Sequence, residues 1–199
     1  MTDRIPVLLV DDDPDLRAVV ASFLREERDR IAVETAPDAA AGLETLSERD
    51  VECIVSDYEL SGRDGLDLLD EVRERDPDLP FILFTGGGSE AVASEAISAG
   101  VTDYMRKSSD TEQCERLADR IVEAVEQRRA EREAEQAVGQ FRAVAKGASD
   151  AILSVDTDGV IRFANAAVEP MFGYEPADLE GEPLTTLIPE RHRADHLEA

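Results

Sequence analysis

Several residues that could do chemistry stand at the ends of short apolar runs. In chain order they are Asp11, Asp12, Asp13, Asp57, Thr85 and Lys107. Carboxylates gathered at one site repel each other unless a hard dication such as Mg²⁺ holds them through oxygen ligands. A carboxylate beside such an ion suits phosphoryl transfer, in which charge spreads over the oxygens of the moving group. If the fold brings these residues together, Asp57 would be both a metal ligand and the nucleophile.

The lysine at position 107 is unusual in a chain that has two lysines and nineteen arginines. An arginine presents a wide planar fork, whereas an ammonium on a flexible stem reaches a single oxygen in a narrow crevice. We therefore predict that Lys107 neutralises one oxygen of the phosphoryl group. Lys146, the other lysine, is interpreted as a surface residue.

The elements that would position these residues alternate between apolar runs and stretches with apolar residues at i, i+3 and i+4. The expected strands span residues 5–10, 31–36, 51–57, 80–85 and 101–105, and the expected helices span 14–27, 37–49, 64–75, 89–100 and 111–127. This alternation predicts an α/β fold, a doubly wound five-stranded parallel sheet covered by helices on both faces. Ligands of such folds bind outside the carboxyl ends of the strands, where the polar residues would converge.

With these residues in place, the chain resembles the receiver domain of two-component response regulators, which has a flavodoxin-like fold. The resemblance covers residues 5–128, and we expect the domain to span residues 1–128. Four motifs carry it: LLVDDDPDLR, CIVSDYELSGRDG, FILFTG and GVTDYMRK. It implies a phosphoacceptor that uses Mg²⁺ as its cofactor, receives phosphoryl from a sensor histidine kinase, and catalyses its own phosphorylation and dephosphorylation.

The resemblance also implies a role for each site residue. Asp57 is the phosphoacceptor, and the metal site comprises Asp12 as a direct ligand, Asp11 acting through water, Asp57 and the backbone carbonyl of Glu59. The phosphoryl contacts are Thr85, the amide of Gly86 and Lys107, and the switch residues are Thr85 and Tyr104. Two departures affect these expectations. Ser108 replaces the usual proline after the lysine, which puts a cis peptide there in doubt, and Ser61 replaces a frequent proline, which should loosen the turn before Asp64 and Gly65.

The second half of the chain begins with a charged helix expected over residues 129–148. Apolar residues recur there at alternating spacings of four and three, namely Ala130, Ala134, Ala137, Phe141, Val144 and Ala148. Such a seam allows a homodimer through this connecting helix. A single solvated helix is an equal alternative, and Gly139 favours it.

Residues 149–199 resemble the first part of a PAS sensor domain and are expected to form an incomplete α+β module. The stretch VIRFANAAVEPMFGY carries the resemblance, with Asn165 at a turn and Phe172 and Tyr174 facing the core. Asp158 and Gly159 signal a hairpin between two short strands. His192 and His196 are interpreted as exposed helix residues and not as metal ligands.

Composition limits the classes of partner. The formal net charge is −25, which repels nucleic acid phosphates and argues against direct DNA binding. High salt screens such a surface, so we expect a halophilic source. Because the chain has no long apolar run and no signal peptide, we expect no membrane partner and a cytoplasmic location. Cys53 and Cys114 are expected to be reduced thiols.

The sequence thus favours a response regulator whose receiver controls a PAS-containing output. A phosphate sink or shuttle between kinases is the main alternative. A haloacid dehalogenase-like phosphatase with Asp11 as its nucleophile would leave Asp57 unexplained. A degenerate receiver used only as a docking scaffold is a further alternative.

Overall fold

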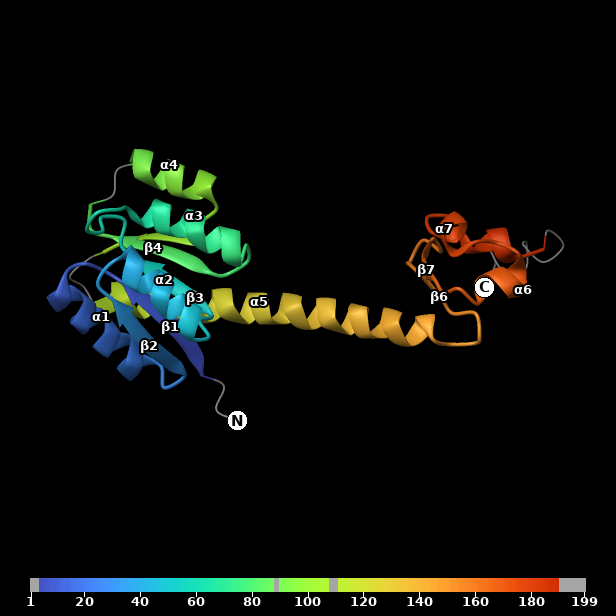
Figure 1. Cartoon of the computed structure of the whole chain (residues 1–199), viewed down its shortest axis with the longest axis horizontal. Coiled ribbons are helices and arrows are strands. Elements are labelled where there is room, and N and C mark those ends of the chain that lie inside the picture. Colours follow the sequence, from blue (N-terminus) through green and yellow to red (C-terminus); the bar gives the residue numbers. More distant parts are fainter. Residues whose placement is uncertain (1–3, 88–89, 108–110, 190–199) are drawn as a thin grey trace. The chain divides into compact units, whose positions relative to one another are not determined.

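The computed structural model describes residues 4–87, 90–107 and 111–189 (Figure 1). These residues divide into two compact units, Met1–Arg132 and Glu133–Ala199. Within the described residues, no helix is long and apolar enough to cross a membrane.

The first unit is built on a parallel sheet. Its strands are β1 (Ile5–Val10), β2 (Ile31–Ala36), β3 (Cys53–Ser56), β4 (Phe81–Thr85) and β5 (Asp103–Arg106), in the order β2-β1-β3-β4-β5. Its helices are α1 (Pro14–Glu27), α2 (Ala39–Glu48), α3 (Gly65–Arg75), α4 (Glu90–Ala99) and the first part of α5 (Thr111–Lys146), which continues into the second unit. The predicted doubly wound five-stranded fold is therefore confirmed, with strands and helices that differ from the expected bounds mainly by a few end residues.

The alternation of side chains along the strands divides the core into two layers. On β1, Ile5, Val7 and Leu9 join a cluster with α1 and α5, whereas Leu8 and Val10 join a cluster with α2, α3 and α4. Figure 1 shows these two groups of helices on opposite faces of the sheet. Because β1, β3 and β4 are covered on both faces, their side chains are almost all buried, as expected for central parallel strands.

Side-chain caps determine where two helices begin next to the strand ends. The Asp13 carboxylate accepts hydrogen bonds from the amides of Asp15 and Leu16, and Pro14 occupies the first turn of α1. Asp64 forms a capping box with Asp67 at the start of α3. These caps define the ends of the loops that follow β1 and β3.

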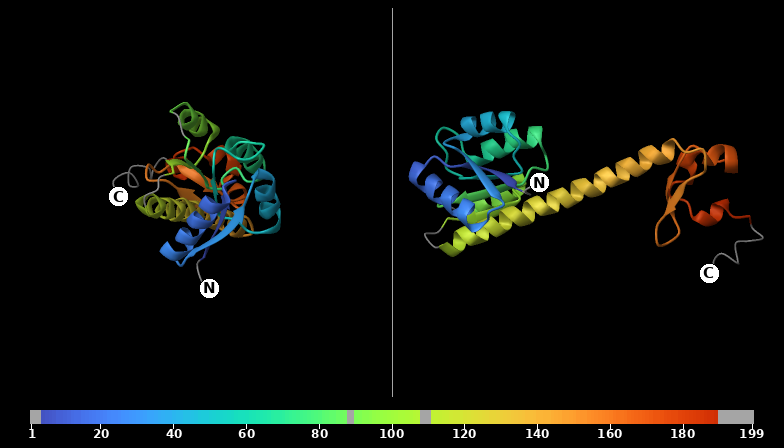
Figure 2. Two further views of the ribbon diagram at one scale, coloured as in Figure 1. Left: turned by 90° about the vertical axis from the view of Figure 1, so that its left-hand side faces the viewer. Right: turned by 90° about the horizontal axis from the view of Figure 1, so that it is seen from below.

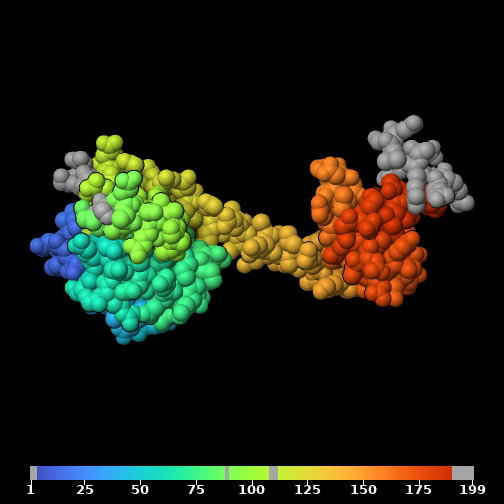
Figure 3. All heavy atoms as spheres, turned by 90° about the horizontal axis from the view of Figure 1, so that it is seen from above, coloured from blue at the N-terminus to red at the C-terminus, as the bar shows by residue number. Residues whose placement is uncertain are grey.

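Helix α5 joins the expected fifth helix and the expected connecting helix in one uninterrupted helix, which Figure 2 follows along its length. Its early residues Leu117, Ala118, Ile121 and Val125 are buried against the sheet. Residues 131–144 are all exposed, and one face of this segment is visible in Figure 3. Pairing through this segment, and the domain boundaries at 128 and 148, stay predictions.

Three arginines hold α5 where its packed part ends. Arg128 is 6% exposed and binds Asp76, which follows α3, and Arg132 lies 3.3 Å from the same carboxylate. Arg129 pairs with Glu52, just before β3, at 2.5 Å. Burial works against ionisation of Asp76, but the hydrogen bond and charge of Arg128 outweigh it and lower the pKa of Asp76. The helix is therefore anchored at the amino-terminal end of the sheet.

The second unit contains an antiparallel pair, β6 (Leu153–Val155) and β7 (Ile161–Ala164), followed by α6 (Val168–Phe172), α7 (Pro176–Leu179) and a 3₁₀ turn, Leu184–Leu187. Asn165 is buried at the turn after β7, where its amide donates to the carbonyls of Ala145 and Asp150 and accepts from the amide of Ile152. Phe163 makes an edge-to-face contact with Phe141 of α5. The end of α5 is thus part of this unit.

One expectation for the second unit is wrong. Phe172 and Tyr174 do not face its core, because each is 41% exposed. The core gathers around Ile161, Val168 and Leu179, and a two-stranded sheet provides only a small face for packing. His192 and His196 lie outside the described residues.

The remaining expectations concern single side chains. Lys146 is exposed, as expected. Cys53 and Cys114 are free thiols, and burial raises the pKa of both.

The anchor of α5 leads to a stability prediction. Asp76→Asn should leave the buried Arg128 charge without its counter-ion and destabilise the first unit by about 2 kcal/mol. This is less than the roughly 3–5 kcal/mol for breaking fully buried pairs, because the Asp76 side chain is 34% exposed. Urea unfolding at neutral pH would measure the change.

The matched control is Asp119→Asn, which removes an ion pair between Arg28 and Asp119, whose side chains are 43% and 63% exposed. This variant should change the free energy of unfolding little.

The stability that Asp76 contributes should depend on pH. Because the folded pKa of Asp76 is lowered, this contribution is present above the unfolded value of about 3.9 and is lost as pH falls through the folded value. Equal stability of the two variants at neutral pH would contradict the anchor.

Candidate functional site

The strand order brings three charged side chains together at the carboxyl ends of β1, β3 and β5. The Lys107 Nζ atom lies 2.7 Å from Asp11 Oδ2 and 2.5 Å from Asp57 Oδ2. Carboxylate oxygens of Asp11, Asp12 and Asp57 lie within 4.8 Å of one another. Residues separated by up to 96 positions in the sequence therefore form one cluster.

The cluster is strongly charged, and three of its four side chains have little contact with solvent. The side chains of Asp11, Asp57 and Lys107 are 2%, 12% and 10% exposed. Three carboxylates, counting Asp12, and one ammonium leave a net charge of about −2 in a low-dielectric site. A hard dication would neutralise this charge and accept the carboxylate oxygens as ligands. The donor set therefore fits Mg²⁺.

Backbone hydrogen bonds orient two of the carboxylates. Asp57 Oδ1 accepts from the amide of Tyr58 at 2.6 Å and from that of Glu59 at 3.4 Å. The amide of Asp57 itself donates to the carbonyl of Val10 at 2.9 Å, which ties the end of β3 to β1. Asp11 Oδ1 accepts from the amide of Asp13 at 3.0 Å. In both residues Oδ2 is left to face Lys107.

A cavity of about 380 Å³ opens beside these groups. It is lined by Asp12, Asp13, Leu16, Asp57, Glu59, Thr85, Gly86, Gly87 and Lys107. Thr85 is fully buried, its hydroxyl accepts from the amide of Gly87 at 3.4 Å, and its carbonyl accepts from the amide of Lys107 at 2.8 Å. The predicted phosphoryl contacts thus border the same space as Asp57.

Two further predicted site residues, Glu59 and Tyr104, differ in their surroundings. Glu59 lines the cavity, and its carboxylate oxygen lies 3.0 Å from where a Cβ on Gly87 would stand. Its carbonyl as a metal ligand stays a prediction. Tyr104 packs against the hydrophobic core cluster that includes residues of α2, α3 and α4. Its buried hydroxyl has no hydrogen-bond partner among the described residues. The Lys107–Ser108 peptide lies outside the described residues.

Two residues matter here that sequence reasoning treated only as parts of a turn. A Cβ at Gly65 would lie 2.3 Å from the carbonyl oxygen of Asp57, so no other residue fits without moving the Asp57 backbone. The hydroxyl of Ser61 donates to Asp12 Oδ2 at 2.9 Å. The Asp64-Gly65 pair in the sequence signals a turn, but not the approach to Asp57.

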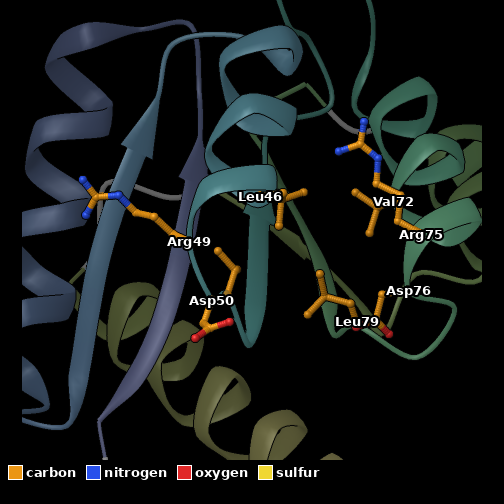
Figure 4. A pocket seen from close by; sticks show the side chains of 8 residues that line it. Leu46, Arg49, Asp50, Val72, Arg75, Asp76 and Leu79 are labelled. Atoms are coloured by element: carbon orange, nitrogen blue, oxygen red, sulfur yellow. The ribbon is translucent and has the colours of Figure 1, made fainter.

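A second cavity, of about 270 Å³, lies at the other end of the sheet, between the ends of α2 and α3 and the starts of β3 and β4. Figure 4 shows its lining side chains, with the guanidinium groups of Arg49 and Arg75 turned away from Asp50 and Leu79. It contains neither the acidic cluster nor a lysine. The predicted site residues therefore border the Asp57 cavity and not this one.

Comparison with known proteins agrees with this geometry. The family model described as "Response regulator receiver domain" matches residues 7–119, and the model described as "PAS fold" matches residues 139–199. The chain belongs to the response regulator receiver domain family. Its receiver is followed by a PAS fold, as the sequence predicted.

Relatives of this response regulator include named regulatory proteins. Nitrogen assimilation regulatory protein NtrX of Azorhizobium caulinodans is 33% identical over 132 residues, which are 65% of this chain and 29% of that protein. C4-dicarboxylate transport transcriptional regulatory protein DctD of Pseudomonas aeruginosa is 38% identical over 125 residues, 62% of this chain and 26% of that protein. The chain thus spans less than a third of the length of these relatives.

Solved structures show the same receiver fold. The signal receiver domain of an HD domain-containing protein from Pseudomonas fluorescens has a TM-score of 0.56 and 28% identity, covering 67% of this chain and 95% of that one. A response regulator protein from Thermotoga maritima, solved in complex with Mg²⁺ and BeF, has a TM-score of 0.52 and 23% identity, covering 59% and 98%. The second likeness shows the fold alone.

Proposed function

We propose that this response regulator accepts a phosphoryl group from the phosphohistidine of a sensor histidine kinase onto Asp57. A phosphorus–oxygen bond to the Asp57 carboxylate forms as the phosphorus–nitrogen bond of the donor breaks. The observation that carries the proposal is that Asp57 borders the cavity and is paired there with the ammonium of Lys107. The protein then relays the change to a PAS-containing output.

Each residue of the cluster has a role in this proposal. Asp12, Asp57 and the carbonyl of Glu59 would hold Mg²⁺ directly, and Asp11 would act through water. The ion, when bound, neutralises the carboxylates so that the donor phosphate can approach. Lys107, Thr85 and the amide of Gly86 would contact the phosphoryl oxygens, and Thr85 with Tyr104 would form the switch. The close approach of the Asp11, Asp12 and Asp57 carboxylates, within 4.8 Å of one another, supports this assignment.

The different surroundings of Asp11 and Asp57 argue against a phosphatase with Asp11 as its nucleophile. The Asp11 side chain is 2% exposed, accepts from Lys107 and the amide of Asp13, and does not line the cavity. Asp57 does line it. A shuttle between kinases uses the same Asp57 chemistry and is the second candidate, since the matched PAS fold is a sensor module and not an effector enzyme.

The proposal extends to partners and surroundings. The net charge of −25 argues against direct DNA binding by this chain, although relatives such as DctD are named as transcriptional regulatory proteins. A cytoplasmic location follows from a kinase donor in the same compartment. A homodimer through the exposed part of α5 would use Phe141 and Val144, which are 47% and 76% exposed.

Phosphorylation tests the central claim. Incubation of the full chain with Mg²⁺ and acetyl phosphate should add one hydroxylamine-labile phosphoryl group, and Asp57→Asn should abolish it. The label, followed by intact mass, should persist in Asp119→Asn, an exposed acid far along the sequence. Label that survives in Asp57→Asn would place the nucleophile elsewhere, and label on Asp11 would favour the phosphatase.

The role of Lys107 is tested with a mimic of the acyl phosphate. Lys107→Arg conserves the charge but puts a wide guanidinium into a site that leaves the lysine side chain 10% exposed. Beryllofluoride should bind this variant at least about tenfold more weakly, a loss of about 1.4 kcal/mol. Isothermal titration calorimetry measures the affinity. Lys146→Arg is the matched control, and indistinguishable affinities of the two variants would remove Lys107 from the phosphoryl site.

The acidic surface predicts a salt dependence. Acids outnumber bases by 46 to 21, so self-repulsion should destabilise the protein in dilute buffer. With Mg²⁺ held constant, the melting temperature should be higher in about 2 M KCl than in about 0.1 M KCl, because the Debye length falls from about 10 Å to below about 3 Å. Equal melting temperatures would argue against a halophilic source.

A further inference from the structure

The three carboxylates of the cluster are not held equally. In both Asp11 and Asp57, Oδ1 accepts at least one backbone hydrogen bond, and Oδ2 forms an ion pair with Lys107. Asp12 is exposed, and its only side-chain hydrogen bond in the described part of the chain comes from the hydroxyl of Ser61, 2.9 Å from Oδ2. Its orientation therefore depends on one contact.

We infer that Ser61 is a positioning residue that orients Asp12 for Mg²⁺; this inference rests on the proposed function. The hydroxyl occupies one oxygen of the carboxylate and leaves the other for the metal. An oriented carboxylate loses less side-chain freedom when the ion binds, and hydrogen-bonded partners of metal ligands commonly change metal affinity by about 10–100-fold.

The contact also joins the two loops that carry the metal ligands. Ser61 lies 49 residues from Asp12, in the loop between β3 and α3, and Asp12 lies in the loop between β1 and α1. The next residue, Gly62, has a φ of +89°, a conformation in which glycine is favoured and which proline often precedes in type II turns. A proline at position 61 would suit that turn but has no hydroxyl. Serine makes the turn less rigid than proline would, but its hydroxyl can donate a hydrogen bond to Asp12.

Substitutions at position 61 separate the hydroxyl from the turn. In the full chain, Ser61→Ala should weaken Mg²⁺ binding about tenfold, measured by isothermal titration calorimetry. Ser61→Pro should weaken it similarly although it stiffens the turn, whereas Ser61→Thr, which keeps the hydroxyl, should retain affinity within about threefold. The control is Ser47→Ala. The Ser47 hydroxyl donates to the carbonyl of Glu44 on α2, so this variant should bind Mg²⁺ with wild-type affinity.

A metal-free readout excludes a general loosening of the fold. The ¹³Cγ chemical shift of Asp12 should move in Ser61→Ala and return in Ser61→Thr, while that of Asp57 and the melting temperature stay at their wild-type values. Unchanged Mg²⁺ affinity and an unchanged Asp12 shift in Ser61→Ala would overturn the inference, as would wild-type affinity in a folded Ser61→Pro.

The failure of this inference is distinguishable from failure of the proposed function. If wild-type protein binds Mg²⁺ and is labelled at Asp57 while Ser61→Ala binds Mg²⁺ equally well, the role of Ser61 alone is wrong. If the wild type neither binds Mg²⁺ nor takes label, both are wrong.

Discussion

The ammonium of Lys107 lies between the carboxylates of Asp11 and Asp57, and the organisation of the site depends on it. Two nearly buried carboxylates on neighbouring strands would repel each other across the end of the sheet. Lys107 arrives from β5 and bonds to both. The negative charge that remains makes the site suitable for a dication. The ion pairs of Lys107 therefore reduce the repulsion between the carboxylates without neutralising the site.

The rest of the first unit serves to hold that arrangement. β1, β3 and β4 are buried on both faces, which leaves their carboxyl ends little freedom to move. The loop after β1 is short, because Asp13 caps the helix that begins at Pro14, and Asp64 caps α3 at the end of the longer loop after β3. Gly65 lets the start of α3 approach the carbonyl of Asp57. Buried strands and capped loops together place the reactive groups within hydrogen-bonding distance.

Helix α5 is secured by different interactions in each unit. In the first unit, apolar packing is followed by Arg128 and Arg129, which pair with Asp76 and Glu52 at the amino-terminal end of the sheet. In the second unit, the buried amide of Asn165 binds the carbonyl of Ala145. The helix thus has polar, geometrically specific contacts where it leaves one unit and where it enters the other. Such contacts depend on direction, so they are sensitive to small displacements of the helix.

The sequence by itself determined the elements and which polar residues meet at one edge of the sheet. Apolar periodicity placed the strands and helices nearly where they lie, because the buried faces of central strands and helices require it. Polar residues at strand ends predicted a common site, since parallel strands bring their carboxyl ends to one edge of the sheet. Family motifs then allowed a role to be proposed for Asp57 and for Lys107. Each of these inferences depends on local pattern and on one general rule of α/β folds.

Only the tertiary structure decided the contacts that cross between distant segments. The sequence gives no sign that Ser61 binds Asp12, that Gly65 approaches the Asp57 carbonyl, or that Arg128 is buried against Asp76. The exposure of Phe172 and Tyr174 was likewise mispredicted, because burial depends on how much apolar surface the neighbouring elements supply. Hydrogen bonds and packing between remote loops depend on distances of a few tenths of an ångström, and no periodicity along the chain encodes them.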